Sequence, residues 1–223
     1  MTKTRNDLRQ GTLWKQILFF SLPIAATSML QQLFNSADVA VVGRFSAQKD
    51  LALAAVGSTS SVVNLFITII TGLAVGANVV IARSIGASDE KRARQAVHTA
   101  LILSLLCGAI LLVLGECIAL PLLEIMDTPS DIIGLAGKYL RIYMLGVFFQ
   151  TIYNFEASIL RANGDTRRPL FCLIFSGAVN VVLNLVFVIG FQLDVAGVAI
   201  ATVLADVVGA GMLFHYLRRE TGP

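Results

Sequence analysis

Charged residues are scarce in this sequence. Aspartate, glutamate, lysine and arginine make up 14% of its 223 residues, whereas hydrophobic residues make up 56%; an average soluble domain carries about a quarter charged residues. So few charges cannot cover a globular surface in water, which excludes an ordinary soluble domain. Three stretches, 16–37, 51–82 and 169–193, contain no charged residue, and each is longer than the roughly 18–20 residues of helix that cross a bilayer. The composition therefore predicts a membrane protein with several spans.

The signatures of common enzymes and metal sites are also missing. The sequence has no HExxH, Walker A or GxSxG motif, and its cysteines, Cys107, Cys117 and Cys172, show no CxxC or Cys/His spacing. The net charge of +3 is small and confined to the connections, which argues against nucleic-acid binding. We therefore expect neither an enzyme nor a cofactor, and we interpret the cysteines as buried free thiols.

The long apolar runs predict six membrane-spanning helices. Backbone groups in lipid must be bonded internally, which leaves helices or closed barrels, and these runs lack the alternating pattern of barrel strands. We expect an all-α polytopic bundle with spans at about 14–42, 51–81, 95–119, 132–160, 168–191 and 195–217.

The basic residues predict the orientation of the bundle. When both ends of the chain and the connections at 83–94 and 161–168 are placed on one side, that side holds thirteen of the 17 lysines and arginines, and the other side holds four. The positive-inside rule makes the richer side cytoplasmic. We therefore expect both termini in the cytoplasm, with residues 1–13 as a cytoplasmic segment ahead of the bundle.

The two internal connections on this side resemble each other. Each has a glycine, Gly86 or Gly164, at which a helix is expected to end with a left-handed residue, and each then has an aspartate, Asp89 or Asp165, suited to the start of the next helix. The similarity fits a repeat of two three-helix units, and it fits a chance likeness between short loops equally well.

Asp38 is the most informative polar residue in the expected spans. An ionisable side chain at membrane depth costs about 2.5–3.5 kcal/mol on insertion scales, so it usually faces a cavity or a partner. At 100° per residue, Gln31, Asn35 and Asp38 share one side of the first helix, and Pro23, about 22 Å earlier along the axis, marks a point where this helix can bend. We interpret the stripe as facing the protein interior; the alternative is an ion pair between Asp38 and Arg44 at the membrane surface.

Later helices carry two further polar pairs at helical spacing. Asn180 and Asn184 share a face of the fifth span, and Thr202 and Asp206 share a face of the sixth. The asparagines fit an ion site and an interhelical hydrogen-bonded contact equally well. A carboxylate in the middle of a span, such as Asp206, has no route to water, which favours a site or a buried partner. Glu156, near the cytoplasmic end of the fourth span, is interpreted as an interface residue.

Five segments in order carry a family pattern: SLPIAATSMLQQLFNSADVAVVGR, GLAVGANVVIARSIGASDEKRARQAVHTAL, ILRANGDTRRPL, NVVLNLVFV and GVAIATVLA. With these segments the sequence, from about Trp14 to Arg219, resembles the N-terminal lobe of a MATE (multidrug and toxic compound extrusion) transporter. The resemblance implies a multi-pass protein of the plasma membrane, in contact with its lipids, built from two six-helix lobes. It also implies that the whole protein exports organic cations or amphipathic drugs in exchange for H⁺ or Na⁺ by alternating access.

In this comparison the chain supplies one lobe, 14–219, and residues 220–223 begin a linker. We therefore expect a second six-helix lobe as a partner, with pairing between two copies of this chain as the less favoured arrangement. Two other functions stay open. One is a flippase for lipids or lipid-linked sugars from the same superfamily, and the other is a half-size membrane subunit that does not transport.

The resemblance also implies roles for individual residues. Asp38 matches the acidic residue of the first helix that binds the coupling ion, which makes Na⁺ at Asp38 one possibility. Pro23 matches the proline at which that helix bends in some members. Asn180 matches a polar partner on the fifth helix. Asn184 is a departure from members resembling the DinF branch, many of which have aspartate there, whereas NorM-like members can have asparagine. Asp206 is a candidate for a substitute second carboxylate. The expected ion-coupling cavity comprises Gln31, Asn35, Asp38, Asn180, Asn184, Thr202 and Asp206.

Overall fold

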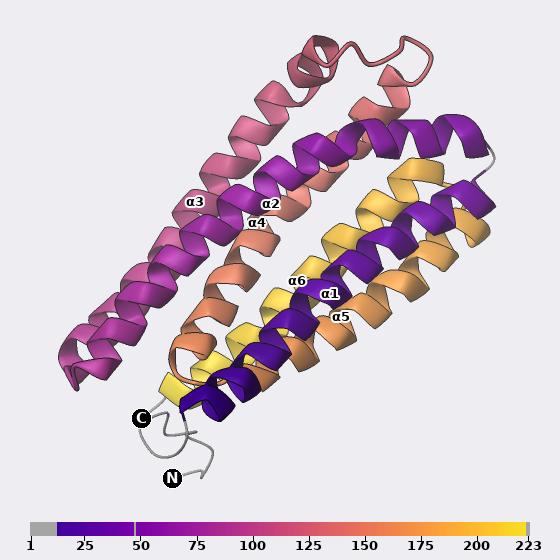
Figure 1. Ribbon diagram of the computed structural model, residues 1–223. Helices are drawn as coiled ribbons and strands as arrows, with labels where there is room; N and C mark the ends of the chain where they lie inside the picture. Colours follow the sequence, from indigo (N-terminus) through magenta and orange to yellow (C-terminus); the bar gives the residue numbers. More distant parts are fainter. Residues whose placement is uncertain (1–12, 47, 222–223) are drawn as a thin grey trace.

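The computed structural model describes residues 13–46 and 48–221, and within them the chain forms six long helices (Figure 1). They are α1 (Leu13–Phe45), α2 (Lys49–Gly86), α3 (Glu90–Ile125), α4 (Ile133–Ala162), α5 (Arg167–Leu185) and α6 (Asp194–Thr221), and a π-helical turn, η1 (Val186–Gly190), continues α5. The expected all-α bundle is confirmed, since the described residues include no strand. The expected cytoplasmic segment, apart from its last residue, and the end of the expected linker lie outside the described residues.

Five of the described helices are long and apolar enough to cross a membrane, by length and composition: α1 from Ile17, α2, α3, α5 with η1, and α6. The remaining helix, α4, has the most extensive packing, against α2, α3 and α6, and most of its side chains are buried. A helix shielded by its neighbours needs less apolar surface toward lipid. The central position of α4 therefore fits its being the one helix, among those described, without a stretch apolar enough to meet this criterion.

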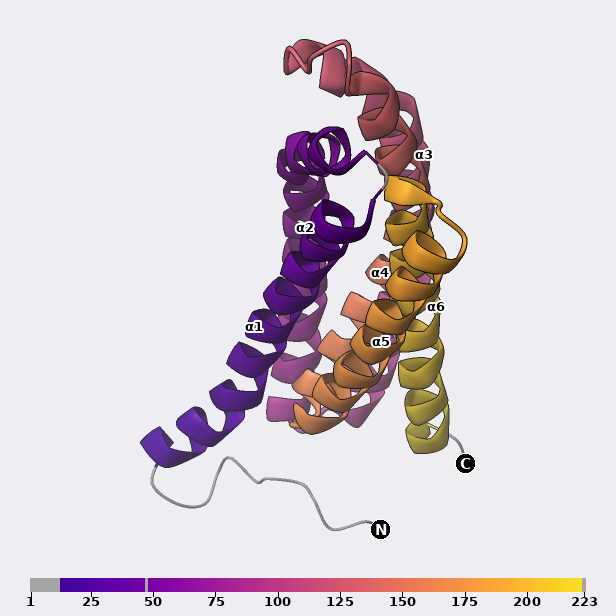
Figure 2. The same ribbon diagram turned by 90° about the vertical axis from the view of Figure 1, so that its right-hand side faces the viewer.

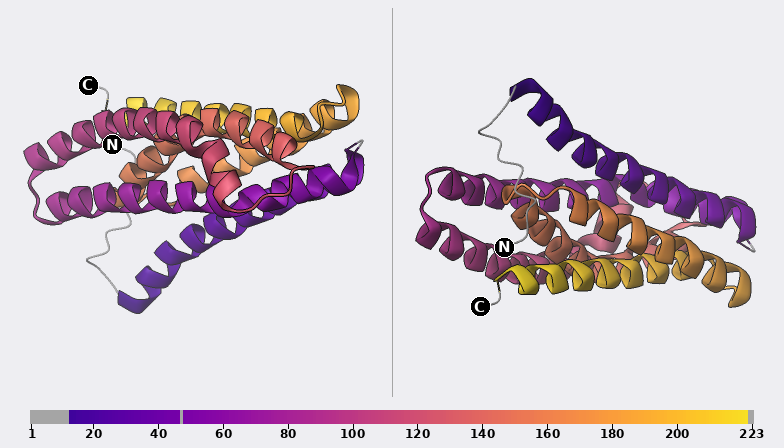
Figure 3. Two further views of the ribbon diagram at one scale, coloured as in Figure 1. Left: turned by 90° about the horizontal axis from the view of Figure 1, so that it is seen from above. Right: turned by 90° about the horizontal axis from the view of Figure 1, so that it is seen from below.

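The other helices are arranged around α4 in two groups (Figures 1 and 2). α2 packs on α3, while α5 packs on α6, and α1 contacts both α5 and α2. The first turns of α1 diverge from the rest of the bundle in Figures 2 and 3. Apolar side chains on these turns, such as Trp14 and Phe19, are largely exposed, which suits a surface in contact with lipid.

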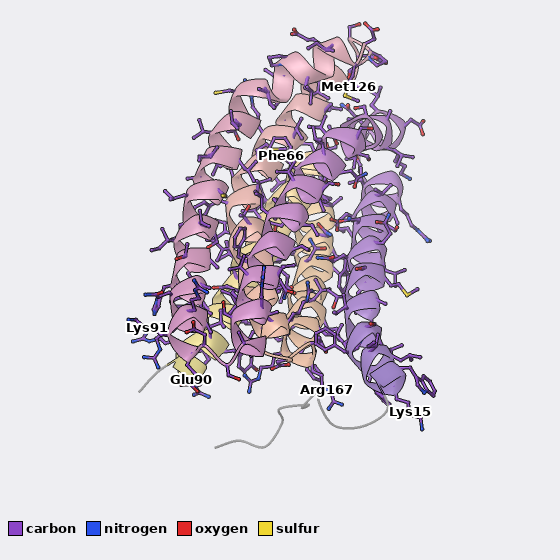
Figure 4. The ribbon with its side chains drawn as sticks, turned by 60° about the vertical axis from the view of Figure 1, so that its left-hand side comes forward. Lys15, Phe66, Glu90, Lys91, Met126 and Arg167 are labelled. Atoms are coloured by element: carbon purple, nitrogen blue, oxygen red, sulfur yellow. The ribbon has the colours of Figure 1, made fainter. Side chains whose placement is uncertain are left out.

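The α2–α3 and α4–α5 turns lie at the same end of the bundle. In Figure 4, Lys15, Lys91 and Arg167 lie at this end, whereas Met126, just beyond α3, lies at the opposite end. These three basic residues, which the sequence assigns to one side, therefore lie at one end of the structure, which we call the basic end. By the positive-inside rule it faces the cytoplasm.

The turns at the basic end place a left-handed residue at equivalent positions. Gly164 has a φ of 86°, which confirms the expectation for that glycine. The expectation for Gly86 is wrong, because α2 continues through it and the left-handed residue is Ser88, with a φ of 57°. The backbone amide of Ala87 still donates to the carbonyl of Arg83 at 3.0 Å, so the helix hydrogen bonds continue past Gly86 and the chain turns two residues later than predicted.

The aspartates that follow these turns have the same role in both. Oδ1 of Asp89 accepts from the amide of Arg92 at 2.9 Å, and Oδ1 of Asp165 accepts from the amide of Arg168 at 3.1 Å. Such bonds satisfy amides that a helix start leaves without a partner. The matched turns join α2 to α3 and α4 to α5, whereas a repeat of three-helix units would match the α2–α3 turn with the α5–α6 turn. The likeness is therefore one of helical hairpins.

Buried apolar side chains form two clusters along the bundle. One, around Val42, Ile70 and Leu140, lies toward the opposite end. The second, the basic-end cluster, comprises Ala74, Ile81, Ala100, Tyr153, Phe155, Ala157, Ile159, Leu160, Cys172, Leu173, Ala210, Leu213 and Leu217. All three cysteines are free, as expected. Their expected burial is correct for Cys172 alone, since Cys107 is half-buried and Cys117 is exposed.

Candidate functional site

Asp38 is buried in the interior of the lobe and is held there by two other helices. Its side chain is 6% exposed. Nδ2 of Asn184, from α5, donates to its Oδ1 at 2.6 Å. The hydroxyl of Thr202, from α6, shares its one proton between Oδ2 of Asp38 at 3.3 Å and the carbonyl of Val198 in its own helix at 3.0 Å. Each carboxylate oxygen therefore accepts a hydrogen bond from a different helix.

Asn180 completes this cluster of side chains. Its Nδ2 donates to the hydroxyl of Thr202 at 3.2 Å, and its Oδ1 accepts from Nδ2 of Asn184 at 3.0 Å. We call Asp38, Asn180, Asn184 and Thr202 the Asp38 network. Oδ1 of Asn184 is buried and has no hydrogen-bond partner among the described residues. An orphaned amide oxygen close to a carboxylate provides a further acceptor for a cation or for an acid proton.

A close approach of α1 and α5 makes this network possible. Gly177 lies one turn before Asn180 on α5, and Phe34 lies one turn before Asp38 on α1. A Cβ atom at Gly177 would overlap the ring of Phe34. The missing side chain at Gly177 therefore lets the aromatic ring pack against the backbone of α5, as small residues commonly do between membrane helices.

No basic side chain among the described residues forms an ion pair with Asp38. The ion pair found among the described residues is that between Arg168 and Asp165, at 3.1 Å. Arg44 instead lies over the ring of Phe45, 5.9 Å from its centroid, so the surface ion pair with Asp38 considered from the sequence is not formed. Burying a bare carboxylate is costly even when it accepts two hydrogen bonds. The geometry therefore favours a bound cation or proton at Asp38.

A cavity of about 280 Å³ lies between α1, α2 and α4, with Asp38 in its wall. Asp38 is the one charged side chain in its lining; the others are amides, hydroxyls, two tyrosines and valines. Asn35 of α1 and Ser60 and Asn64 of α2 are exposed, so part of the lining is open. The full lining is Gln32, Asn35, Ser36, Asp38, Val39, Val56, Thr59, Ser60, Val63, Asn64, Tyr139 and Tyr143.

The cavity-facing side of α1 differs slightly from the stripe predicted from the sequence. Asn35 lines the cavity with Asp38, as expected. Gln31 does not: it is half-buried, and Gln32 takes the place in the lining that the prediction assigned to it. By helical phase Gln31 falls between Asn35 and Asp38, which both line the cavity, so helical spacing alone does not account for its absence from the lining.

Asp206 and Pro23 lie apart from the Asp38 network. Asp206 is one turn beyond Thr202, but no hydrogen bond joins it to the network within the described part of the chain; its Oδ2 is 3.4 Å from where a Cβ of Gly146 on α4 would be. Pro23 lies inside α1, which runs through it without a break. The carbonyl of Pro23 accepts from the hydroxyl of Thr27 at 2.8 Å.

Several residues of the cavity were missed by the sequence analysis. Tyr139 and Tyr143 of α4 are both buried and stack on each other, with ring centroids 6.0 Å apart. On α2, Ser60 and Asn64 have the same i, i+4 spacing that singled out the asparagines of α5. The signal was therefore present in the spacing of these polar residues. The interpretation of Glu156 as an interface residue is wrong, because its side chain is completely buried.

Six helices that enclose a buried, unpaired carboxylate beside a polar cavity define one lobe of a membrane transport protein. The chain belongs to the MatE family, whose sequence model matches residues 23–186. This confirms the resemblance seen in the sequence. Members of the family are transporters rather than enzymes, and the chain is a multi-pass protein of the plasma membrane.

Known proteins resemble the chain over its whole length. YpnP of Bacillus subtilis (strain 168) is 33% identical over 214 residues, which cover 94% of this chain and 46% of YpnP. YoeA of the same organism is 30% identical over 219 residues, 95% of this chain and 46% of YoeA. Both are named as probable multidrug resistance proteins. A crystal structure of MATE in the bent conformation has a TM-score of 0.91 and 30% identity, and covers 100% of this chain and 49% of that one. The chain therefore spans about half the length of these proteins.

Proposed function

We propose that this chain forms one lobe of a secondary active multidrug exporter, which moves organic cations or amphipathic compounds out of the cell in exchange for H⁺ or Na⁺. The observation that carries the proposal is the state of Asp38. It is buried, accepts hydrogen bonds from Asn184 and Thr202, has no basic partner among the described residues, and lines a polar cavity. The names of YpnP and YoeA support multidrug substrates.

Competition for one carboxylate couples ion and substrate. A cationic substrate in the cavity and a coupling ion at Asp38 each neutralise the same charge, so binding of one weakens binding of the other. When H⁺ or Na⁺ neutralises Asp38, the cost of sealing the cavity around a bare charge is removed. α1 then bends at Pro23, where the helix lacks a backbone donor, and the cavity closes as the substrate leaves.

Both coupling ions are compatible with the oxygen atoms at this site. Na⁺ is a hard cation that favours oxygen ligands. The amide of Asn184 links the oxygens available here, because its Nδ2 donates both to Oδ1 of Asp38 and to Oδ1 of Asn180, and its own Oδ1 has no partner among the described residues. A proton needs fewer ligands: it binds one oxygen of Asp38, and the acid O–H can donate to a nearby amide oxygen. An experiment that imposes each ion gradient in turn distinguishes H⁺ coupling from Na⁺ coupling.

The test is ion-driven efflux of a fluorescent organic cation from liposomes that carry either an H⁺ or a Na⁺ gradient. We expect Asp38→Asn to abolish efflux driven by the coupling ion, because the variant has no charge to neutralise. The matched control is Asp50→Asn, at an exposed aspartate in the first turn of α2, which should leave efflux unchanged. Normal gradient-driven efflux by Asp38→Asn would contradict the proposal.

The same assay separates the other functions that the sequence left open. The chain is reconstituted alone and together with a second six-helix lobe. Efflux that requires the second lobe supports the proposal, whereas efflux by the chain alone indicates pairing of two copies. Movement of labelled lipid without movement of the cation indicates a flippase, although the cavity lining contains no lysine or arginine to bind an anionic headgroup. No movement of either indicates a non-transporting subunit.

A further inference from the structure

Glu156 lies among buried apolar side chains near the basic end of the lobe. Its side chain is 0% exposed, and its neighbours along α4, Phe155 and Ala157, belong to the basic-end cluster. Tyr143, the nearest residue of α4 that lines the cavity, precedes Glu156 by about 20 Å of helix. Glu156 is therefore separate from the Asp38 network and takes no part in the site described above.

The carboxylate of Glu156 lies without a polar partner in the described part of the chain. Both Oε1 and Oε2 are buried, and neither has a hydrogen-bond partner among the described residues. Arg161 follows five positions later, so it projects from a different side of α4, and the described residues show no ion pair between the two. Asp38 is also buried, but it accepts two hydrogen bonds. The bare charge is therefore harder to sustain at Glu156 than at Asp38.

The titratable groups close to Glu156 do not offset its charge. They are Tyr153 on α4 and the buried Cys172 on α5, both near enough to interact with it electrostatically. The hydroxyl of Tyr153 already donates to the carbonyl of Pro169 at 2.9 Å. The basic residues, histidines and tyrosine of α2, α3 and α6 toward the basic end are exposed, apart from the half-buried Tyr216; they are Arg83, Lys91, Arg92, Arg94, His98, His215, Tyr216, Arg218 and Arg219.

A proton is the one ligand that this environment can accept. A hard metal cation needs several oxygen ligands, yet the oxygens of Glu156 have no hydrogen-bonding neighbour, and the described residues contain no group of three His, Cys, Asp or Glu side chains that could hold a metal. A proton needs no second ligand, and it removes the charge whose burial is most costly. We propose that Glu156 is a second proton-binding site of this lobe, and that it carries a proton in this conformation. The proposal does not depend on antiport or on the role of Asp38.

Infrared spectroscopy of the full chain tests the site directly. The chain is labelled with glutamate carrying ¹³C at its side-chain carboxyl, so that the carbonyl band of protonated glutamic acid shifts while that of protonated aspartic acid does not. The sequence has five glutamates, which keeps the assignment simple. At neutral pH we expect a label-shifted band in the wild type that is lost in Glu156→Gln. The control, Glu124→Gln, removes an exposed glutamate and should keep the band.

Two infrared outcomes would overturn the proposal: no label-shifted band in the wild type, or the same band in Glu156→Gln. The first needs no variant and so does not depend on folding. A second measurement follows thermal unfolding in detergent against pH. Because the folded state resists the loss of this proton, wild-type stability should fall relative to Glu156→Gln as the pH rises, while Glu124→Gln should follow the wild type. A difference between wild type and Glu156→Gln that stays constant with pH would also overturn the proposal.

Discussion

Asn184 on α5 donates a hydrogen bond of 2.6 Å from its Nδ2 to Oδ1 of Asp38 on α1, across a separation of 146 residues in the sequence. Both side chains are buried, so the bond lies where water cannot replace it. It ties the first helix of the lobe to the fifth at the most polar point of the interior. Its donor is an amide at a position where an aspartate side chain would supply a second carboxylate, and this leads to the first prediction.

Asn184→Asp should extend H⁺-driven efflux to higher pH. The substitution places a second carboxylate beside Asp38 and removes a donor, and two buried carboxylates in contact cannot both be ionised. The pair should therefore keep one proton over a range about one pH unit or more beyond that of Asp38 alone. Efflux measured across a pH series in liposomes checks this shift, and an unchanged pH profile would contradict it.

Thr202→Val should weaken binding of the coupling ion while the shape of the side chain is preserved. The variant loses the hydroxyl that donates to Asp38 and accepts from Asn180. Membrane hydrogen bonds are worth roughly 0.6–2 kcal/mol, which corresponds to about a 3- to 30-fold loss of affinity.

The control for this variant is Thr68→Val on α2. Thr68 is exposed, and its hydroxyl bonds to the carbonyl of Asn64 in its own helix at 2.8 Å. The ion concentration that gives half-maximal efflux is measured for both variants. Equal behaviour of the two would show that the bond from Thr202 to Asp38 is unimportant.

Gly177→Ala should destabilise the lobe and disturb the Asp38 network. The added methyl group would overlap the ring of Phe34, and such overpacking typically costs about 1–3 kcal/mol. Because this contact sets the distance between α1 and α5, ion-driven efflux should fall as well. Gly211→Ala is the matched control, since nothing lies within 4 Å of a Cβ there.

A double variant tests the cause of this effect. Phe34→Ala removes the ring that the new methyl group meets, so Gly177→Ala should cost less in a Phe34→Ala background than in the wild type. Thermal unfolding of the four proteins in detergent supplies the comparison. If the two substitutions are additive, the clash is not the source of the instability.

The two turns at the basic end should respond oppositely to small changes. Gly164→Ala should destabilise the lobe by about 1–2 kcal/mol, because Gly164 has a φ of 86° and a side chain is disfavoured there. Ser88→Gly should stabilise it by about 0.5 kcal/mol, since relief of the left-handed serine outweighs the flexibility that glycine adds to the unfolded chain. Thermal unfolding checks both signs. A stabilised Gly164→Ala would contradict the backbone argument.

Hydropathy and charge predicted the helices well, because both depend on whether a segment lies in lipid or in water and not on which helices lie beside it. A continuous apolar run must form a helix in lipid wherever its neighbours lie, and basic residues gather at one end under the same rule for every connection. The exact ends of the helices were less predictable. At Gly86 the hydrogen bonds of α2 continue to Ala87, and the residue type alone did not show that the turn would fall on Ser88.

The candidate site was only partly predictable. The sequence placed Asp38 in the interior and put Asn180 and Asn184 on one helical face, but it could not show that they meet. It also drew Gln31 into the cavity and left out Tyr139 and Tyr143, because helical phase within one segment says nothing about the rotation of that segment against its neighbours.

The sequence by itself determined the number and order of the helices, the end that carries the positive charge, and the presence of a carboxylate at membrane depth. These properties follow from the local free energy of placing each residue in lipid or in water. Only the tertiary structure decided that Asp38 accepts its hydrogen bonds from α5 and α6 and that Glu156 is buried among apolar side chains. Those outcomes depend on which helix faces pack together, and that choice is made by contacts such as Phe34 against Gly177, between residues far apart in the chain.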